Sequence, residues 1–254
     1  MNLGIDGKTA LVTASSKGLG RACAIALAAE GVNVVICARG RDALESTARE
    51  ITSAGGTAHA VVADVTDADA PDYLVETTVG RFGAIDIVVG NGGGPPAMRA
   101  LEVDDAAMAQ ALNDNLRAMV RLVRAAVPRM VASRWGRICL ITSSAVNEPM
   151  PALALSNTAR TGLWAWAKTA AQDLRQHAGR VGNVVLGPAY GAQQVVCAGG
   201  KAVGAAQCRQ RCHNAVVPPE AHAAIACGLG RGKEEAAAPG LAAEVGLRGL
   251  RDAR

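Results

Sequence analysis

Short runs of apolar residues alternate with longer amphipathic stretches along most of this chain. The apolar runs predict strands at Thr9–Thr13, Val32–Cys37, Ala58–Ala63, Ile85–Val89, Arg137–Thr142 and Arg180–Leu186, and the stretches between them predict helices at Gly18–Glu30, Asp42–Ala54, Asp69–Arg81, Asp105–Ala132 and Leu153–His177. This alternation favours an α/β fold, a doubly wound parallel sheet with helices on both faces. No linker rich in Pro, Gly or Ser divides the region, so we predict a single domain.

The pattern fades after about Gly187, where the chain becomes rich in Ala, Gly and Cys. Neither the period of a strand nor that of a helix persists there, and no last strand is evident. We therefore divide the chain into a core of residues 1–187 and an atypical C-terminal segment of residues 188–254.

The turn after the first predicted strand, Thr13–Gly20, carries the clearest functional signal. It consists mostly of small residues and opens directly into a helix, so backbone N–H groups and the helix N-terminus face one small volume that favours a phosphate. Gly18 and Gly20 have no Cβ atom to obstruct a ligand or the packing of helix on strand. Glycines also occur in such turns for steric reasons alone, but the next strand follows at βαβ spacing, which favours nucleotide binding.

Composition excludes several other classes of function. Half the residues are hydrophobic and only 2% are aromatic, so Ala, Val and Leu must fill the core. The net charge of +4 comes without a block of Lys or Arg, which argues against a nucleic-acid partner. No signal peptide or membrane-length apolar run is evident, so we expect a cytoplasmic protein with no membrane partner. Seven irregularly spaced cysteines predict reduced thiols, and Cys208, Cys212 and His213 lack a second pair at zinc spacing, so no metal is expected.

Several ordered motifs resemble those of the short-chain dehydrogenase/reductase family. Thr13–Gly20 resembles its Thr-Gly-x-x-x-Gly-x-Gly turn, with Ala14 in place of the first glycine, which the turn accommodates if the φ of Ala14 stays negative. Asp64-Val65 matches the pair that contacts adenine, and Asn91-Gly92-Gly93 resembles the Asn-Asn-Ala-Gly segment beside the cofactor. With Gly94-Pro95-Pro96, residues 5–188 are most similar to the 3-oxoacyl-carrier-protein-reductase-like members. The resemblance implies a Rossmann-like fold and these cofactor-binding residues: Thr13, Ser15, Ser16, Lys17, Gly18, Leu19, Gly20, Arg39, Asp64, Val65, Asn91, Gly92 and Gly93.

The end of the second predicted strand favours NADP(H) over NAD(H). Dehydrogenases that use NAD commonly place a carboxylate there for the ribose hydroxyls, whereas this chain has Ala38 followed by Arg39. Lys17 and Arg39 would converge on the adenosine 2′-phosphate. The alternative is that both are ordinary solvated surface charges.

The catalytic positions depart from the family pattern. Asn115 and Ser143 match the family's asparagine and serine, but Ser156 and Arg160 stand where the family has tyrosine and lysine. The i, i+4 spacing places residues 156 and 160 on one helix face. An aliphatic hydroxyl is a far weaker acid than a phenol, and a guanidinium does not release a proton near neutral pH. The alternatives are that both residues only cap and solvate a helix, or that Lys168 is a substitute base.

The resemblance also makes the C-terminal segment anomalous, because the family's last strand and substrate lid have no counterpart in it. If Gly246–Asp252 had GC-rich codons, a shift of one base could read Ala-Ser-x-Ala-Tyr-Val-Thr, which resembles the family's approach to that strand. We therefore hypothesise that part of residues 188–254 is read out of frame, which resequencing the gene would test. Since the family's oligomers pack through this region, a homo-oligomer is in doubt.

The sequence as a whole predicts an oxidoreductase that transfers hydride between NADP(H) and a small carbonyl or alcohol substrate. The main alternative is a nucleotide-binding protein of the same fold with little or no turnover. A third hypothesis is a non-binding product of a damaged gene.

Overall fold

The apolar runs form one parallel sheet at the centre of the molecule. The computed structural model describes residues 3–177, 181–186, 195–196 and 202–203. Six strands pair in the order β3-β2-β1-β4-β5-β6, and all five pairings are parallel. The strands are β1 (Thr9–Val12), β2 (Asn33–Ala38), β3 (Thr57–Val62), β4 (Ile87–Gly90), β5 (Gly136–Ile141) and β6 (Val181–Leu186). This confirms the doubly wound, Rossmann-like α/β sheet.

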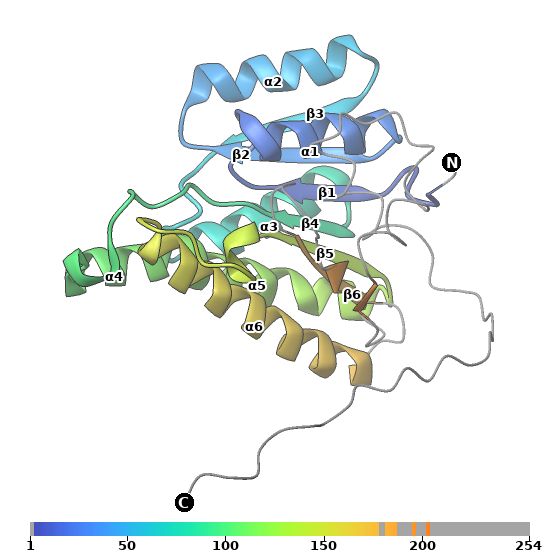
Figure 1. Ribbon diagram of the computed structural model, residues 1–254. Coiled ribbons are helices and arrows are strands. Elements are labelled where there is room, and N and C mark those ends of the chain that lie inside the picture. The colour runs from blue at the N-terminus through green and yellow to red at the C-terminus, as the bar shows by residue number, and fades with distance from the viewer. Residues whose placement is uncertain (1–2, 178–180, 187–194, 197–201, 204–254) are drawn as a thin grey trace, which may run out of the picture.

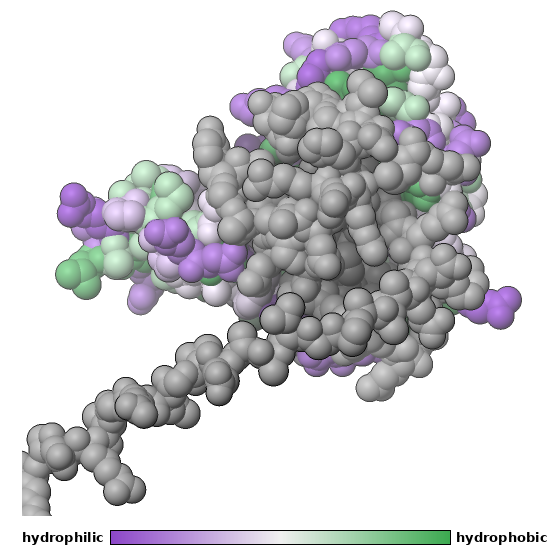
Figure 2. All heavy atoms as spheres, turned by 45° about the vertical axis from the view of Figure 1, so that its right-hand side comes forward, coloured by the Kyte–Doolittle hydropathy of each residue, from purple (hydrophilic) through white to green (hydrophobic). Residues whose placement is uncertain are grey.

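Helices cover both faces of the sheet (Figure 1). They are α1 (Gly18–Ala29), α2 (Arg41–Ser53), α3 (Ala70–Phe82), α4 (Asp105–Leu112), α5 (Ala118–Ala132) and α6 (Ala154–His177). The core cluster on one face takes its helical residues from α1 and α2, and the cluster on the other face takes them from α3, α5 and α6. Many side chains at the top of the molecule, where α2 lies, are hydrophilic (Figure 2), in agreement with the exposed Arg41 and Asp42.

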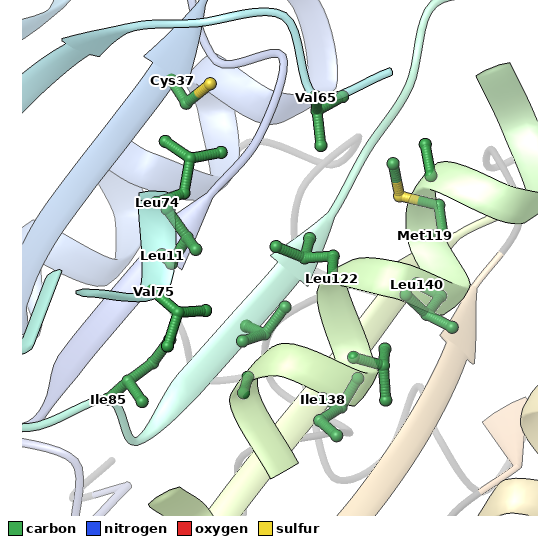
Figure 3. Packing of buried hydrophobic residues seen from close by; sticks show 14 of the residues in the cluster. Leu11, Cys37, Val65, Leu74, Val75, Ile85, Met119, Leu122, Ile138 and Leu140 are labelled. Carbon is green, nitrogen blue, oxygen red and sulfur yellow. The ribbon is translucent and has the colours of Figure 1, made fainter. Parts of the chain in front are cut away.

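Alternate residues of each strand supply the two core clusters. In β1, Ala10 and Val12 face the α1 and α2 side, whereas Leu11 faces the other. Figure 3 shows Leu11, Ile138 and Leu140 of the strands close to side chains from α3 and α5. Because both faces are covered, the strands are apolar along their whole length, and for this reason the sequence alone predicts them.

The predicted helix Asp105–Ala132 is wrong in one respect. A π-helical turn, Asn113–Arg117, separates α4 from α5. The backbone remains right-handed helical on both sides of this turn, with a φ of −66° at Leu112 and −57° at Ala118, and no residue there is a helix breaker, so the sequence predicts one helix. The other boundaries agree with the predictions to within two residues.

The predicted anomaly of the C-terminal segment falls mostly outside the described residues. Two short strands, β7 (Val195–Val196) and β8 (Ala202–Val203), form an antiparallel pair. The missing last strand, the lid, the out-of-frame hypothesis and Cys208, Cys212 and His213 concern residues that the structure does not describe. The division at residue 187 therefore stays a prediction.

Candidate active site

The predicted site residues gather where the sheet changes direction. β1 pairs with β2 on one side and β4 on the other, so the chain runs outward both ways from this point. Thr13, Arg39 and Asn91 directly follow the carboxyl ends of β1, β2 and β4, and Asp64 and Ser143 stand two residues beyond β3 and β5. Parallel strands end at one edge, and open α/β sheets bind ligands in the crevice there.

Buried hydroxyl groups hold the turn after β1 in place. The hydroxyl of Thr13 donates to the Asn91 carbonyl at 2.8 Å and accepts from the Asn91 N–H at 2.9 Å. The hydroxyl of Ser15 donates to the Val12 carbonyl at 2.9 Å and accepts from the Cys37 N–H at 3.0 Å. Both side chains are fully buried, so their part in any cofactor site is to shape the turn.

Ala14 does not keep the negative φ expected of it. Its φ is +46°, in the left-handed region that costs a residue with a Cβ atom about 1–2 kcal/mol. The carbonyl of Ala14 accepts from the Asn91 side-chain amide at 3.3 Å, and a Cβ atom on Gly20 would lie 2.4 Å from the same oxygen. The turn therefore requires a left-handed residue at position 14 and glycine at position 20, and alanine at 14 is strained.

The start of α1 suits an anion. Lys17 is its N-cap residue, is exposed, and makes no side-chain capping hydrogen bond, and the first turn contains no acidic residue. Gly18 has a φ of +59° with open space around it, while Ser16 and Leu19 are half-buried. The first amides of the helix are therefore available to a phosphate group.

The cationic side of the crevice contains one ion pair. An Arg39 nitrogen lies 3.7 Å from an Asp64 carboxylate oxygen, and Arg39 is largely exposed. The other Asp64 oxygen accepts from the backbone and the hydroxyl of Thr66, at 3.0 and 2.8 Å. Val65 packs its side chain into the core, so any contact it makes with a ligand falls to its backbone.

The loop after β4 approaches the π turn closely. A Cβ atom on Gly92 would lie 3.2 Å from the Asp114 carbonyl oxygen and 3.8 Å from the Asn115 side-chain oxygen, whereas Gly93 has open space. Asn115 is buried, and its side-chain amide donates to the Ala111 carbonyl at 3.3 Å. Its side-chain oxygen accepts no hydrogen bond from the part of the chain described. Buried polar atoms of this kind are frequent at functional sites, as are π turns.

Ser143 begins the segment that follows β5, where it caps a short 3-10 helix, Ser144–Val146. Its hydroxyl oxygen accepts from the Ala145 N–H at 3.2 Å, which leaves the hydroxyl proton for an acceptor in the crevice. The hydroxyl of Ser156, half-buried on α6, makes no hydrogen bond with the described residues.

Arg160 connects α6 to the end of β5 through hydrogen bonds. One of its terminal nitrogens donates to the carbonyls of Ile141 and Thr142, at 3.1 and 3.2 Å. These two residues immediately precede Ser143, so the guanidinium lies beside the start of that segment. Partial burial lowers the pKa of Arg160 because desolvation disfavours the cation, but an arginine so shifted remains protonated near neutral pH.

The structure also shows polar residues that the sequence did not suggest. The Thr66 carbonyl accepts from the Asn113 side chain at 3.4 Å and from Arg121 at 3.5 Å. This network connects the loop after β3 to the π turn. The Asp64-x-Thr66 spacing could have indicated this loop structure in the sequence, since an aspartate side chain commonly accepts a hydrogen bond from the backbone N–H two positions later.

The loop after β4 joins the loop that leads from β5 into α6. Met98, after β4, and Leu153, before α6, form an isolated parallel bridge, in which the Met98 N–H donates to the Ala152 carbonyl at 2.7 Å. The Asn157 side chain donates to the Met150 carbonyl at 2.9 Å. Leu101 and Met150, which lie in these two loops, are exposed.

Other candidates for chemistry find structural roles. The Lys168 ammonium lies 4.2 Å from the centre of the Trp164 ring, which gives this residue a partner on its own helix. Cys23, Cys37 and Cys139 are buried free thiols, and burial raises the pKa of Cys23 and of Cys37 to about 12, so they are poor nucleophiles. The described residues hold no cluster suited to a metal ion, and none of their helices is long and apolar enough to span a membrane.

Comparison with known proteins agrees with this geometry. The family model for short chain dehydrogenase matches residues 8–195. A 3-oxoacyl-[acyl-carrier-protein] reductase of Synechocystis is 34% identical over 184 residues, which are 72% of this chain and 74% of that protein. The corresponding reductase FabG of Staphylococcus aureus is 29% identical over 181 residues, 71% and 74% of the two chains.

A solved structure shares both fold and sequence. The crystal structure of a metagenomic short-chain oxidoreductase in complex with NADP has a TM-score of 0.68 and 32% identity, covering 73% of this chain and 84% of that one. Together with the parallel sheet, the turn after β1 and the polar residues that follow the strand ends, these matches show that the chain belongs to the short chain dehydrogenase family.

Proposed function

We propose that this protein is an NADP(H)-dependent reductase of carbonyl compounds, or dehydrogenase of the corresponding alcohols. The observation that carries the proposal is the pair of hydrogen bonds that Arg160 donates to the carbonyls of Ile141 and Thr142. It fixes the helix of Ser156 beside Ser143, on the sheet edge where the turn after β1 offers uncapped amides. Groups that would hold the cofactor and groups that would hold the substrate thereby stand at one edge of the sheet.

The cofactor site fits a dinucleotide phosphorylated at the ribose. The uncapped amides at the start of α1 would hold the pyrophosphate, and the exposed Gly18, with open space where a Cβ atom would stand, leaves that surface free of a side chain. Lys17 and Arg39 are exposed cations at the ends of neighbouring elements, and either would pair with a 2′-phosphate. The structural relative bound to NADP supports this choice.

The chain's own residues would orient the substrate and stabilise charge. When bound, the nicotinamide supplies or accepts the hydride. Ser143 would donate its hydroxyl proton to the substrate oxygen, because its own oxygen is already held by the Ala145 N–H. Arg160 would bind ribose and stabilise the oxyanion, and Ser156 or a water would close the proton path.

Removing the Ser143 hydroxyl tests the proposal. We expect Ser143→Ala to lower kcat for NADPH-dependent reduction by about 10²–10³-fold, the usual effect of losing one donor to an oxyanion. NADPH affinity, measured by fluorescence titration, should stay unchanged. Full activity in this variant would refute the role of Ser143.

The alternative is a nucleotide-binding protein with little turnover, and Ser156 favours it. Its hydroxyl lacks the acidity of a phenol, and general acid–base catalysis is worth about 10²–10⁴-fold. NADPH fluorescence enhancement without consumption of NADPH across a panel of carbonyl compounds would support this alternative.

A further inference from the structure

Arg160 is a half-buried cation with no acidic partner among the residues that the structure describes. The ion pairs of the described residues involve Lys8, Arg21, Arg39, Arg41 and Arg129. The guanidinium bonds carbonyl oxygens through one terminal nitrogen, and the N–H groups of its other two nitrogens make no hydrogen bond in that part of the chain.

Such a charge is costly unless an anion accompanies it. Desolvation already lowers the pKa of this group, and two neutral carbonyls do not balance a full charge. Ribose hydroxyls and a ketone oxygen are also neutral, and the alkoxide formed in reduction is transient. A guanidinium held by one nitrogen keeps an edge of parallel N–H groups, which matches a carboxylate in bidentate geometry.

We propose that the substrate is a free oxo acid, or the corresponding hydroxy acid, whose carboxylate pairs with Arg160. This inference rests on the proposed function and names the substrate class of the same site. The reaction is oxo acid + NADPH + H⁺ → hydroxy acid + NADP⁺: the hydride forms the new C–H bond, the C=O π bond breaks, and the oxygen takes the proton. The carboxylate itself is unchanged.

Apolar residues of the joined loops would suit the rest of such a molecule. Met98 and Leu153 form the bridge between these loops, Leu101 and Met150 are exposed in them, and the Met150 carbonyl accepts from Asn157, one turn before Arg160 on α6. An apolar chain beyond the carbonyl would cover part of this surface. The site therefore favours an oxo acid with a short aliphatic chain over a compound that is charged at both ends.

Matched substrates test the inference by turnover. We expect kcat/KM for 2-oxohexanoate to exceed that for its ethyl ester at least tenfold. In Arg160→Gln this ratio of acid to ester should fall at least thirtyfold, and in Arg160→Lys it should fall less, because charge is kept and the bidentate edge is lost. Arg124→Gln, which removes an exposed arginine of α5, is the control and should leave the ratio unchanged. Comparing ratios cancels any effect of Arg160 on the oxyanion itself.

A binding measurement separates this inference from the proposed function. Calorimetric titration with oxamate, an anion that does not react, and with neutral oxamide is carried out with and without saturating NADP⁺. Oxamate binding that is lost in Arg160→Gln, with oxamide not binding, supports the inference even if no carbonyl compound is reduced. Reduction of ketones without preference for the acid, and no oxamate binding in either state, overturns the inference and leaves the proposed function intact. Thermal unfolding confirms that each variant is folded.

Discussion

The motif resemblance aligns Ser156 and Arg160 with a tyrosine and a lysine, and a hydroxyl and a guanidinium cannot share a proton as a phenol and an ammonium do. Arg160 retains positive charge, but the carbonyls of Ile141 and Thr142 hold it in place. Ser156 retains a hydroxyl, whose proton is bound too tightly to be released near neutral pH. In the proposed site, Ser156 would therefore limit proton transfer, and Arg160 would still stabilise negative charge.

Restoring both groups should raise the rate of ketone reduction. In Ser156→Tyr with Arg160→Lys, we expect kcat for a neutral ketone to rise about tenfold or more, since a phenol next to a cation is the better acid. The pH profile of kcat should acquire a limb that the wild type lacks. Each single variant is the control, and a double variant with the wild-type rate would show that proton transfer does not limit turnover.

The strain at Ala14 predicts a gain in stability. Ala14→Gly removes a left-handed alanine, which costs about 1–2 kcal/mol, and adds some freedom to the unfolded chain. We expect a net increase of about 0.5–1 kcal/mol in the free energy of unfolding, measured with urea. Ala24→Gly, in the buried interior of α1, should instead destabilise by about 1 kcal/mol or more.

At the level of elements, the turn and helix α1 depend on Gly20. In Gly20→Ala the new Cβ atom would meet the Ala14 carbonyl oxygen, a backbone atom that cannot move alone. We expect at least a tenfold loss of NADPH affinity in a fluorescence titration. Gly80→Ala is the matched control, because a Cβ atom on this residue of α3 meets nothing within 4 Å; it should bind NADPH normally. Unchanged NADPH affinity in Gly20→Ala would refute a dinucleotide site at this turn.

The sequence predicts elements better than it predicts turns. Strands buried on both faces are continuous apolar runs, and residues that follow them lie at one edge, so Thr13, Asn91 and Ser143 were predictable from strand ends. The π turn around Asn115 and the left-handed Ala14 were not, because each is imposed by contacts between distant segments. Asn91 bonds Ala14 across 77 positions, and Asn113 bonds Thr66 across 47.

At the scale of the whole molecule, one series of polar contacts runs along the crevice. It begins at Arg39, passes through Asp64 and Thr66, and ends at Asn113 in the π turn of Asn115. The elements that would hold the adenosine end of the cofactor are thus joined to those around the reacting end. Because the crevice lies between the two halves of the sheet, a cofactor bound there contacts both and should stabilise the entire domain.

That stabilisation gives the last prediction, which concerns the choice of cofactor. NADPH at a hundred times its Kd should add about 2.7 kcal/mol to the free energy of unfolding, which raises Tm by roughly 5–10 °C for a domain of this size. NADH at the same concentration should raise Tm less, because it has no 2′-phosphate for Lys17 and Arg39. In Lys17→Glu with Arg39→Asp the two carboxylates would repel that phosphate, so the shift with NADPH should fall to that with NADH or below it. Arg49→Glu, which reverses an exposed charge on α2, should keep the wild-type difference between the cofactors. If the double variant also kept the wild-type difference between NADPH and NADH, these two cations would not select the cofactor. The ion pair between Arg39 and Asp64 would then be a surface contact with no part in recognition.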